Sequence, residues 1–318
     1  MQSGAQHDTL EACKPSDVVA SADLSESVSS FLAAAIAPAT RKAYQGDLRD
    51  FILWGGAVPC GATAVAEYVA DRASIHSPHT IARRLVSISR AHTSQGLPDP
   101  VKTDLVRTVL RGVRRTYGGP QRRASPVLRG DVFPMLELMT SIKGARDRAL
   151  ILIGFAAALR RSELVALDVD ELQFVSEGLL IHLSRSKTDQ EGAGRRIAIP
   201  NGRTSACAVT AMRNWLAVSG ITTGAVFRGV GKSGAIAASR LSDQSVSLIV
   251  KKYALAVGLP ATAYSGHSLR AGLVTSAAKA GVSFLKIQQQ TGHRSTEMLT
   301  RYIRDANVFQ DNAAGLLL

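Results

Sequence analysis

Six side chains in the second half of the chain are of types that act on phosphate groups. Phosphoryl transfer needs cations for the non-bridging oxygens, a nucleophile in line with the bond that breaks, and a proton for the leaving oxygen. Arginine forks suit the oxygens, lysine can protonate a leaving alkoxide, and a tyrosine hydroxyl is a covalent nucleophile when nearby cations favour its phenolate. The chain supplies all of these types, in Arg160, Lys187, His267, Arg270, His293 and Tyr302.

Taken one at a time, these residues also have ordinary structural interpretations. Arg160 precedes Glu163 by three residues, so the two share a helix face and could form a surface ion pair. Lys187 lies in the polar segment "SRSKTDQEG", where a solvated turn lysine is common. His267 and Arg270 stand near an expected helix start, which is a natural anion site, but an HxxR pair also recurs by chance.

The last two candidates are equally ambiguous alone. His293 follows a glycine at another expected helix start and could be a hydrogen-bonded structural histidine. Tyr302 lies between Arg301 and Arg304 and could be a surface tyrosine on a basic amphipathic helix. The interpretation as one site therefore depends on the whole set, and on elements that bring distant segments together.

Residues 24–117 are predicted to form a small all-helical domain, preceded by a loose polar tail over 1–23. Helical segments are expected over 24–37, 38–56, 62–74, 77–96 and 102–119. The fourth has Ser77 as N-cap, Pro78 at its first position and Gly96 at its end, a sound pair of start and stop signals. No strand pattern appears in this region.

A basic segment joins this domain to the rest. Residues 101–130 hold eight basic side chains against one acid, Asp104. The sequence "GGPQRRASP" within it is typical of a linker, which we place at 118–126. A basic linker is either simply disordered or suited to pass over a phosphate backbone.

The second domain, residues 127–318, is predicted to be mixed. Helices are expected first, over 129–139, 144–159 and 160–167. "GLLIHLSRSKT" and "GRRIAIP" are short alternating runs separated by a polar turn, which predicts a β-hairpin. Helices return over 205–220, 242–258, 267–281, 283–292 and 295–306.

Composition narrows the partners. The 318 residues include 38 basic and 25 acidic side chains, a net charge of +13, which indicates a polyanion such as nucleic acid or an anionic membrane. The longest apolar run, 149–159, is shorter than the roughly 20 residues of a spanning helix, so we expect a buried core helix. Three isolated cysteines, Cys13, Cys60 and Cys207, predict reduced thiols, a cytoplasmic setting and no zinc.

The ordered segments "ALRRSELVAL", "SRSKT", "HSLRAG", "TGH" and "RYI" resemble the tyrosine recombinase (phage integrase) family, and "YSGHSLRAG" resembles its Cre-like members. The resemblance covers roughly residues 24–318. It implies a mainly α fold with a small β-sheet: an all-helical, SAM-like core-binding domain and a mixed α/β catalytic domain of the DNA breaking-rejoining type. The two domains would form a C-shaped clamp on DNA.

The resemblance also implies roles for the candidate residues. Arg160 and Arg270 would clamp the scissile phosphate, with Glu163 supporting the site; Arg161 is a rival, but the family's arginine precedes its acid by three, which fits Arg160. Lys187 would be the general acid. His267 would assist proton movement at the nucleophile. His293 would hydrogen-bond a non-bridging oxygen, although Cre-like members carry Trp there. Tyr302 would form a 3′-phosphotyrosyl bond.

No cofactor is expected. We find no paired acids at coordinating spacing and no GxxxxGK[ST] loop, and a phosphotyrosyl bond would conserve the energy of the cleaved bond, so neither metal nor ATP is implied. Double-stranded DNA with an inverted-repeat site is the expected partner, bound by a dimer on one site and a tetramer in the synapse. The candidate DNA contacts are basic residues on first-domain helices or near the linker: Arg41, Lys42, Arg83, Arg84, Arg111, Arg114 and Arg115.

Several alternatives stay open. A type IB topoisomerase-like nicking-closing enzyme would use the same chemistry. A DNA-binding protein with a vestigial site would carry the same residues without catalysing a reaction. The apolar end "NAAGLLL" is expected to bury itself in a neighbouring protomer or in its own domain, and the family's habit of tail exchange favours the neighbour.

Overall fold

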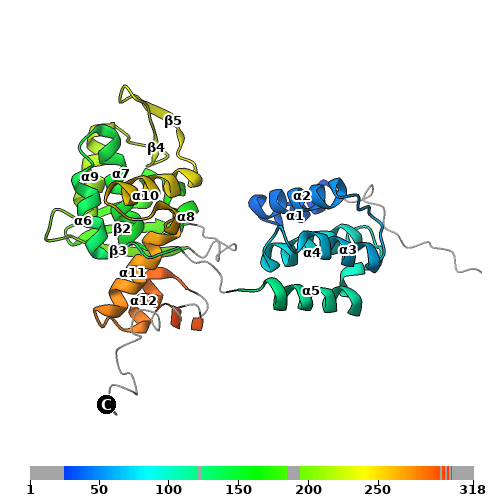
Figure 1. The fold of residues 1–318 in the computed structure, drawn as a ribbon. Coiled ribbons are helices and arrows are strands. Elements are labelled where there is room, and N and C mark those ends of the chain that lie inside the picture. Colours follow the sequence, from blue (N-terminus) through cyan, green and yellow to red (C-terminus); the bar gives the residue numbers. More distant parts are fainter. Residues whose placement is uncertain are drawn as a thin grey trace, which may run out of the picture. The chain divides into compact units, whose positions relative to one another are not determined.

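The computed structural model of the chain describes residues 25–119, 124–184, 194–293, 296, 297, 299, 300 and 302. It divides into two compact units, Met1–Gln121 and Arg122–Leu318. The change of unit falls inside the range 118–126 for which we expected a linker. Each unit has its own hydrophobic core and is described by itself (Figure 1).

The described residues of the first unit form helices. They are α1 (Glu26–Ala34), α2 (Pro38–Leu53), α3 (Ala62–Arg72), α4 (Pro78–Thr93) and α5 (Asp104–Tyr117), with a short 3₁₀ turn at Pro100–Lys102. Ser77 caps α4 as predicted, because its hydroxyl accepts a hydrogen bond from the Thr80 amide at 3.2 Å. α4 packs against α2 and α5, and α3 packs against α5.

An aromatic group fills the core of this unit. The Phe51 ring meets the Tyr68 ring edge to face at 5.0 Å between centroids, and Trp54 packs edge to face on Tyr68 at 5.3 Å. Phe51 and Tyr68 are fully buried. Burial of each such side chain stabilises the fold by roughly 1.5–3 kcal/mol, so the C-terminal end of α2 is held against α3 at one point.

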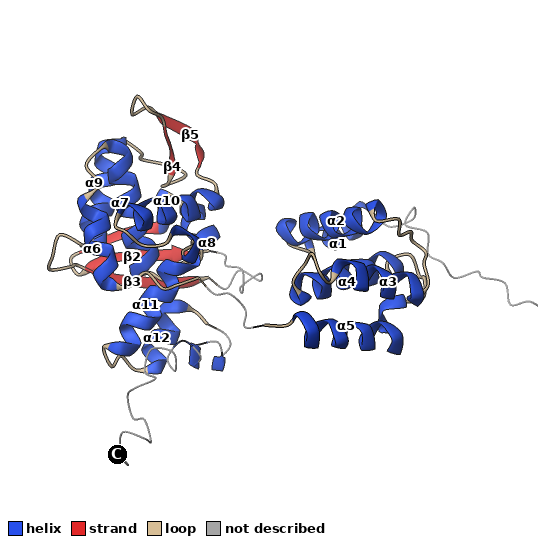
Figure 2. Ribbon diagram, in the orientation of Figure 1, coloured by secondary structure: helices blue, strands red, loops and turns tan. Residues whose placement is uncertain are grey.

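The second unit combines helices with two small sheets: a three-stranded sheet lies among the helices, and a two-stranded sheet projects from them at the top of Figure 2. Its helices are α6 (Arg129–Glu137), α7 (Ile142–Ala156), α8 (Arg161–Ala166), α9 (Ala208–Ser219), α10 (Asp243–Ala256), α11 (His267–Lys279) and α12 (Phe284–Thr291). Its strands are β1 (Leu172–Val175), β2 (Gly178–Leu183), β3 (Arg195–Pro200), β4 (Arg228–Val230) and β5 (Ile236–Arg240). The structure is thus mainly helical with small sheets, as expected.

The predicted hairpin is present as β2 and β3. The two strands are antiparallel, with Leu183 opposite Arg195 and Gly178 opposite Pro200. β1 adds to the other edge of β2, giving the order β1-β2-β3, and β4 pairs with β5 separately. We had expected the hairpin alone, so β1 and the β4–β5 pair are additions to the sequence prediction.

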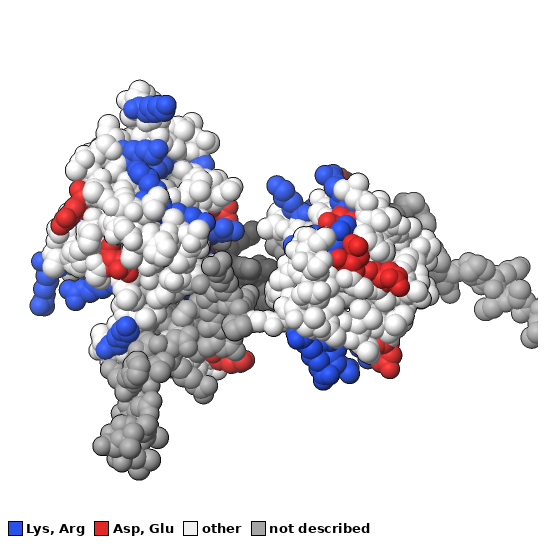
Figure 3. Space-filling model, viewed as in Figure 1, with Lys and Arg blue, Asp and Glu red and all other residues white. Residues whose placement is uncertain are grey.

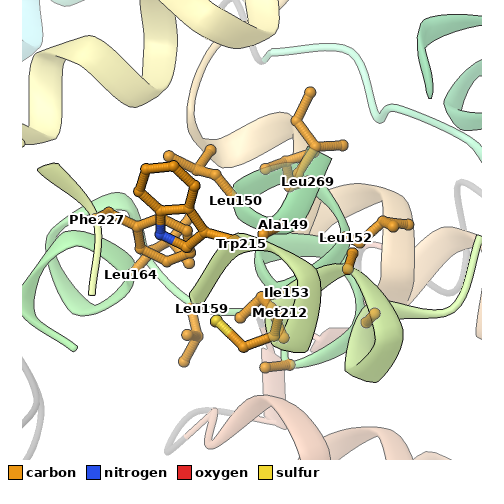
Figure 4. Packing of buried hydrophobic residues seen from close by; sticks show 14 of the residues in the cluster. Ala149, Leu150, Leu152, Ile153, Leu159, Leu164, Met212, Trp215, Phe227 and Leu269 are labelled. Carbon is orange, nitrogen blue, oxygen red and sulfur yellow. The ribbon is translucent and has the colours of Figure 1, made fainter. Parts of the chain in front are cut away.

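The core of the second unit is organised around α7, which is buried on most of its surface as expected for 149–159. Figure 4 shows Trp215 and Phe227 packed with Leu150 and Leu164. The Trp215 indole donates a hydrogen bond of 2.8 Å to the Val226 carbonyl, so this buried ring leaves no unpaired donor. α7 therefore fixes the position of the chain that leaves its C-terminal end.

Among the residues that the structure describes, no helix is both long and apolar enough to cross a membrane.

Candidate functional site

The chain that leaves α7 places Arg160 at the N-cap of α8. The Arg160 amide donates to Glu163 Oε2 at 3.0 Å, and its Nη1 donates to Glu163 Oε1 at 2.5 Å. Glu163 is buried and the Arg160 side chain is 17% exposed. Arg161, by contrast, forms an exposed ion pair with Asp243 at 3.0 Å. The two arginines therefore have different partners: Glu163 holds Arg160, and Asp243 pairs with Arg161.

The turn before α8 holds a backbone conformation that is unusual for a residue with a side chain. Ala158 has φ of +50°, in the left-handed region, and is fully buried. Such a conformation costs about 1–2 kcal/mol outside glycine. It directs the Ala158 carbonyl to accept a hydrogen bond of 2.7 Å from Arg270 Nη1. The strained turn thus links Arg270 on α11 to the segment that carries Arg160.

Arg270 is almost completely enclosed, with 6% of its surface exposed. Its Nη2 is buried and has no hydrogen-bond partner among the described residues. Burial, followed by the nearby Arg160 charge, lowers the pKa of Arg270 to about 10, which still leaves it charged at neutral pH. A buried guanidinium with one free edge is arranged to bind an anion.

His267 is the first residue of α11 and is exposed, three positions before Arg270 on the same helix. Its backbone amide donates to the Ser265 hydroxyl at 3.2 Å. The i, i+3 spacing places both side chains on one face of the helix.

His293 enters the same environment from the end of α12. It follows Gly292, which ends the helix with φ of +64°, and its Nδ1 lies 2.7 Å from the buried Thr291 hydroxyl. Burial lowers the pKa of His293 to about 4, with Arg270, Arg160 and Arg195 acting in the same direction. The imidazole is therefore neutral at physiological pH and suits hydrogen bonding rather than charge neutralisation.

Tyr302 lies beside the same group. Its side chain is partly buried against a small apolar cluster formed by Val274, Ala278, Ile287 and Leu299. Burial and the charge of Arg160 lower the pKa of Arg270, whereas Tyr302 acts to raise it. The phenol is therefore within electrostatic reach of that guanidinium. Arg301 and Arg304 lie outside the described residues.

Lys187 also lies outside the described residues, on the segment between β2 and β3. The structure thus brings together Arg160, Glu163, Arg270, His293 and Tyr302 from four separate parts of the second unit. Among the described residues, no group of three or more His, Cys, Asp or Glu side chains is arranged to hold a metal ion.

Arg195 belongs to this site, and we did not predict it. It is the first residue of β3, and its Nη1 donates to the Gln290 carbonyl at 3.3 Å. Burial lowers the pKa of Arg195, and the charge of Arg160 acts in the same direction. Strand alternation could have identified it, because Arg195 shares a face with the buried Ile197 and Ile199.

The candidate DNA contacts differ in exposure. Arg41 and Lys42 on α2 are exposed, as are Arg111, Arg114 and Arg115 on α5, where Lys and Arg gather in Figure 3. Arg83 is half exposed and forms an ion pair of 2.9 Å with Asp47.

Arg84 does not suit a groove contact, and we correct its interpretation. It is 8% exposed; its Nη1 donates to Asp50 at 2.6 Å and to the Tyr68 hydroxyl at 3.1 Å. Two neighbouring arginines in a helix point in different directions, so here Arg83 faces outwards and Arg84 faces the core. Arg84 therefore has a structural role inside the first unit.

An apolar cavity of about 510 Å³ lies elsewhere in the second unit. Its lining includes Phe133 on α6, Leu273 on α11 and Val282 between α11 and α12. This volume is within the roughly 300–1,000 Å³ of cavities that enclose several apolar groups.

Comparison with known proteins gives consistent matches. The model of the phage integrase family matches residues 129–308. The integrase/recombinase xerD homolog of Selenomonas ruminantium is 39% identical over 285 residues, covering 86% of this chain and 84% of the relative. Recombinase cre of Escherichia phage P1 is 29% identical over 246 residues, covering 71% and 70%.

Solved structures share the fold at lower identity. A lambda integrase dimer bound to a COC′ core site superposes with a TM-score of 0.63 at 17% identity, covering 90% of this chain and 96% of that one. The XerH site-specific recombinase bound to a palindromic difH substrate gives 0.60 at 17% identity, covering 82% and 74%.

Proposed function

Because this chain belongs to the phage integrase family of tyrosine recombinases, which are site-specific DNA recombinases, we infer that it cleaves and rejoins DNA strands at a specific site. One observation carries this inference: the Arg270 guanidinium has a buried nitrogen without a hydrogen-bond partner among the described residues, and it lies within electrostatic reach of both Arg160 and the Tyr302 phenol. Such an arrangement fits a single phosphodiester and a covalent nucleophile.

Arg160 and Arg270 bind the non-bridging oxygens of the scissile phosphate. Glu163 acts through Arg160, since its two oxygens hold the backbone and the guanidinium of that residue. His293, in its neutral form, donates a hydrogen bond to one of these oxygens. Because these groups are ordered before DNA binds, their reorganisation costs little when charge develops on the phosphate.

Tyr302 attacks the phosphorus, so that a P–O bond to the phenol forms and the P–O5′ bond breaks. Lys187 gives a proton to the leaving 5′-oxygen, and His267 assists removal of the phenol proton. The products are a 3′-phosphotyrosyl bond and a free 5′-hydroxyl. Attack by the 5′-hydroxyl of a partner strand reverses the step and generates a Holliday junction. Each step exchanges one phosphodiester bond for another, so the bond energy is conserved and no ATP is needed.

The first unit supplies a second DNA contact. Exposed arginines on α5 and the exposed pair Arg41 and Lys42 meet phosphates, and the two units together form a C-shaped clamp around the duplex. The protein is then DNA-associated in the cytoplasm, as a dimer on one inverted-repeat site and a tetramer in the synapse.

The apolar cavity supports the oligomer. Its lining is mainly apolar, and the chain carries the apolar segment "NAAGLLL" at 312–318. We propose that this segment of one protomer enters the cavity of the next.

The nucleophile is tested with DNA that the protein selects itself. The Tyr302→Phe variant is used to select tight-binding duplexes from a random-sequence library, and the selected site is rebuilt with a nick that traps cleaved product. We expect the unsubstituted protein to form a covalent adduct that resists denaturation and persists in EDTA, and Tyr302→Phe to bind without forming one. Covalent adducts formed by Tyr302→Phe would show that Tyr302 is not the nucleophile.

A plasmid experiment separates recombination from topoisomerase activity. Supercoiled plasmids with and without the selected site are incubated with the protein. Recombination predicts relaxation and strand exchange only where the site is present. Equal relaxation of both plasmids would favour the type IB topoisomerase-like alternative.

A further inference from the structure

Arg195 carries a cationic group that the described part of the protein leaves without a complete set of partners. One nitrogen, Nη1, donates to the Gln290 carbonyl near the C-terminal end of α12. The other, Nη2, is buried and has no hydrogen-bond partner among the described residues. A buried, unpaired donor on a charged group costs several kcal/mol unless a ligand satisfies it.

The charges around Arg195 also leave the pocket with more positive than negative groups. Three guanidiniums, those of Arg160, Arg195 and Arg270, influence one another electrostatically, and the acid among the described residues that acts on them is Glu163. Both oxygens of Glu163 already accept hydrogen bonds from Arg160. The pocket therefore has an excess of positive charge, and an anion is the group that would complete it.

Two other buried or half-buried arginines of this unit have their donors satisfied, so among the described residues of the unit the open donors are specific to Arg195 and Arg270. Arg146 is buried, yet its Nε and Nη2 pair with Asp147 at 2.8 and 2.6 Å and its Nη1 donates to the Arg228 carbonyl. Arg148 donates to the carbonyls of Leu136 and Ser205. Arg195 and Arg270 share the opposite property, a buried Nη2 left open, and both lie in the candidate site.

Packing holds Arg195 in place. A Cβ at Gly292 would come far inside van der Waals contact with the Arg195 guanidinium, so the glycine provides the space in which that side chain lies. The guanidinium is thus fixed between the start of β3 and the residue that precedes His293.

We propose that Arg195 is a further phosphate-binding residue, whose Nη2 donates a hydrogen bond to a non-bridging oxygen of the scissile phosphate alongside Arg270. This proposal rests on the proposed function of the same site.

A substitution pair with equal charge change tests the proposal. Arg195→Ala and Arg196→Ala each remove one guanidinium, but Arg196 is exposed and points to the other face of β3. On the selected DNA site we expect Arg195→Ala to slow single-turnover cleavage by roughly 100-fold, as for loss of one donor to a reacting oxygen, and Arg196→Ala to change it little. Arg195→Lys should recover part of the rate.

Chemical substitution of the phosphate distinguishes contact from indirect support. A methylphosphonate at the scissile position replaces one charged oxygen by a methyl group. For the diastereomer that lacks the oxygen bound by Arg195, we expect the difference between the unsubstituted protein and Arg195→Ala to shrink to a few-fold. An equal loss on the phosphodiester and on both diastereomers would overturn the proposal, as would unimpaired cleavage by Arg195→Ala.

A measurement without DNA keeps this proposal separate from the proposed function. Inorganic phosphate should raise the melting temperature of the unsubstituted protein and of Arg196→Ala, and raise that of Arg195→Ala clearly less. Equal increases in all three would count against Arg195 as an anion ligand, even if Tyr302 proves to be the nucleophile. Circular dichroism of each variant before titration reports whether it is folded.

Discussion

At the scale of single residues, the site combines charged and neutral groups that burial keeps in defined states. Arg270 stays protonated despite enclosure, while His293 stays neutral beside it. In the proposed mechanism the two would act differently on the phosphate, since a guanidinium neutralises charge and a neutral imidazole only donates a hydrogen bond. Their states depend on each other because each cation added to the pocket disfavours protonation of the histidine.

His293 predicts a specific acid sensitivity. Its pKa is about 4 in the folded state against 6.5 as an ordinary value, so the unfolded chain binds the proton more readily. Stability contributed by the neutral histidine is therefore complete above about pH 6.5 and is lost as the pH falls towards 4. We expect the free energy of unfolding to fall by up to about 3 kcal/mol more over this range than in His293→Gln.

Urea unfolding at several pH values measures this difference. His182→Gln, which removes a half-buried histidine on β2, serves as control and should follow the unsubstituted protein. Parallel curves for His293→Gln and the unsubstituted protein would contradict the neutral state of His293.

The site residues differ in how far the sequence could predict them. Arg160, Glu163 and Arg270 lie in segments with recognisable residue order, and the structure brings them together. Arg195 was missed because an arginine at the start of a strand is usually solvated. Its burial depends on the end of α12, which contacts β3 only in the folded chain. Thr291, which contacts His293, was missed for the same reason.

At the scale of elements, helices were easier to predict than short strands. The starts of α2 and α4 carry Pro38 and Pro78, and their apolar periodicity is long enough to recognise. β1 and β4 have four and three residues, too few to show an alternating pattern. Their pairing is decided by neighbours in space, such as the β2 edge that β1 joins.

α5 provides a test of DNA binding by the first unit. Its buried face carries Val106 and Val113, and its outer face exposes Arg111, Arg114 and Arg115. If each arginine meets a phosphate, each alanine substitution should reduce the slope of log affinity against log salt by about 0.9. The measurement is a binding titration on the selected site at several salt concentrations.

Arg84→Ala is the contrasting variant. Its guanidinium satisfies Asp50 and Tyr68, so we expect the free energy of unfolding to fall by about 2 kcal/mol while the salt slope stays unchanged. An unchanged salt slope in the α5 variants, or a reduced slope in Arg84→Ala, would show that the exposed face of α5 is not the DNA-binding surface of the first unit.

At the scale of the whole molecule, the net charge of +13 and the apolar cavity address different partners. The charge attracts DNA at long range and weakens in salt. The cavity, in the proposed tail exchange, would bind an apolar group at short range and with little dependence on salt. Cooperative assembly on DNA therefore requires a contact that the positive surface cannot supply, because like-charged protomers repel.

Tail exchange is tested by complementation between two defective proteins. One lacks residues 313–318, and the other carries Val282→Glu at the half-exposed rim of the cavity. We expect each alone to occupy single half-sites, and an equal mixture to recover paired occupancy in a gel-shift assay, because an intact tail meets an intact cavity. A tail that folds back on its own protomer would give no recovery in the mixture.

The close approach of Arg195 to Gly292 also constrains how the sequence can drift over generations. Any new side chain at position 292 would collide with the guanidinium, and φ of +64° there adds a backbone penalty. Replacement at 292 therefore requires the Arg195 guanidinium to move or shorten, and the backbone penalty remains in either case. A non-glycine residue at 292 is therefore expected only together with a smaller residue at 195, whereas residue 195 can vary while Gly292 stays.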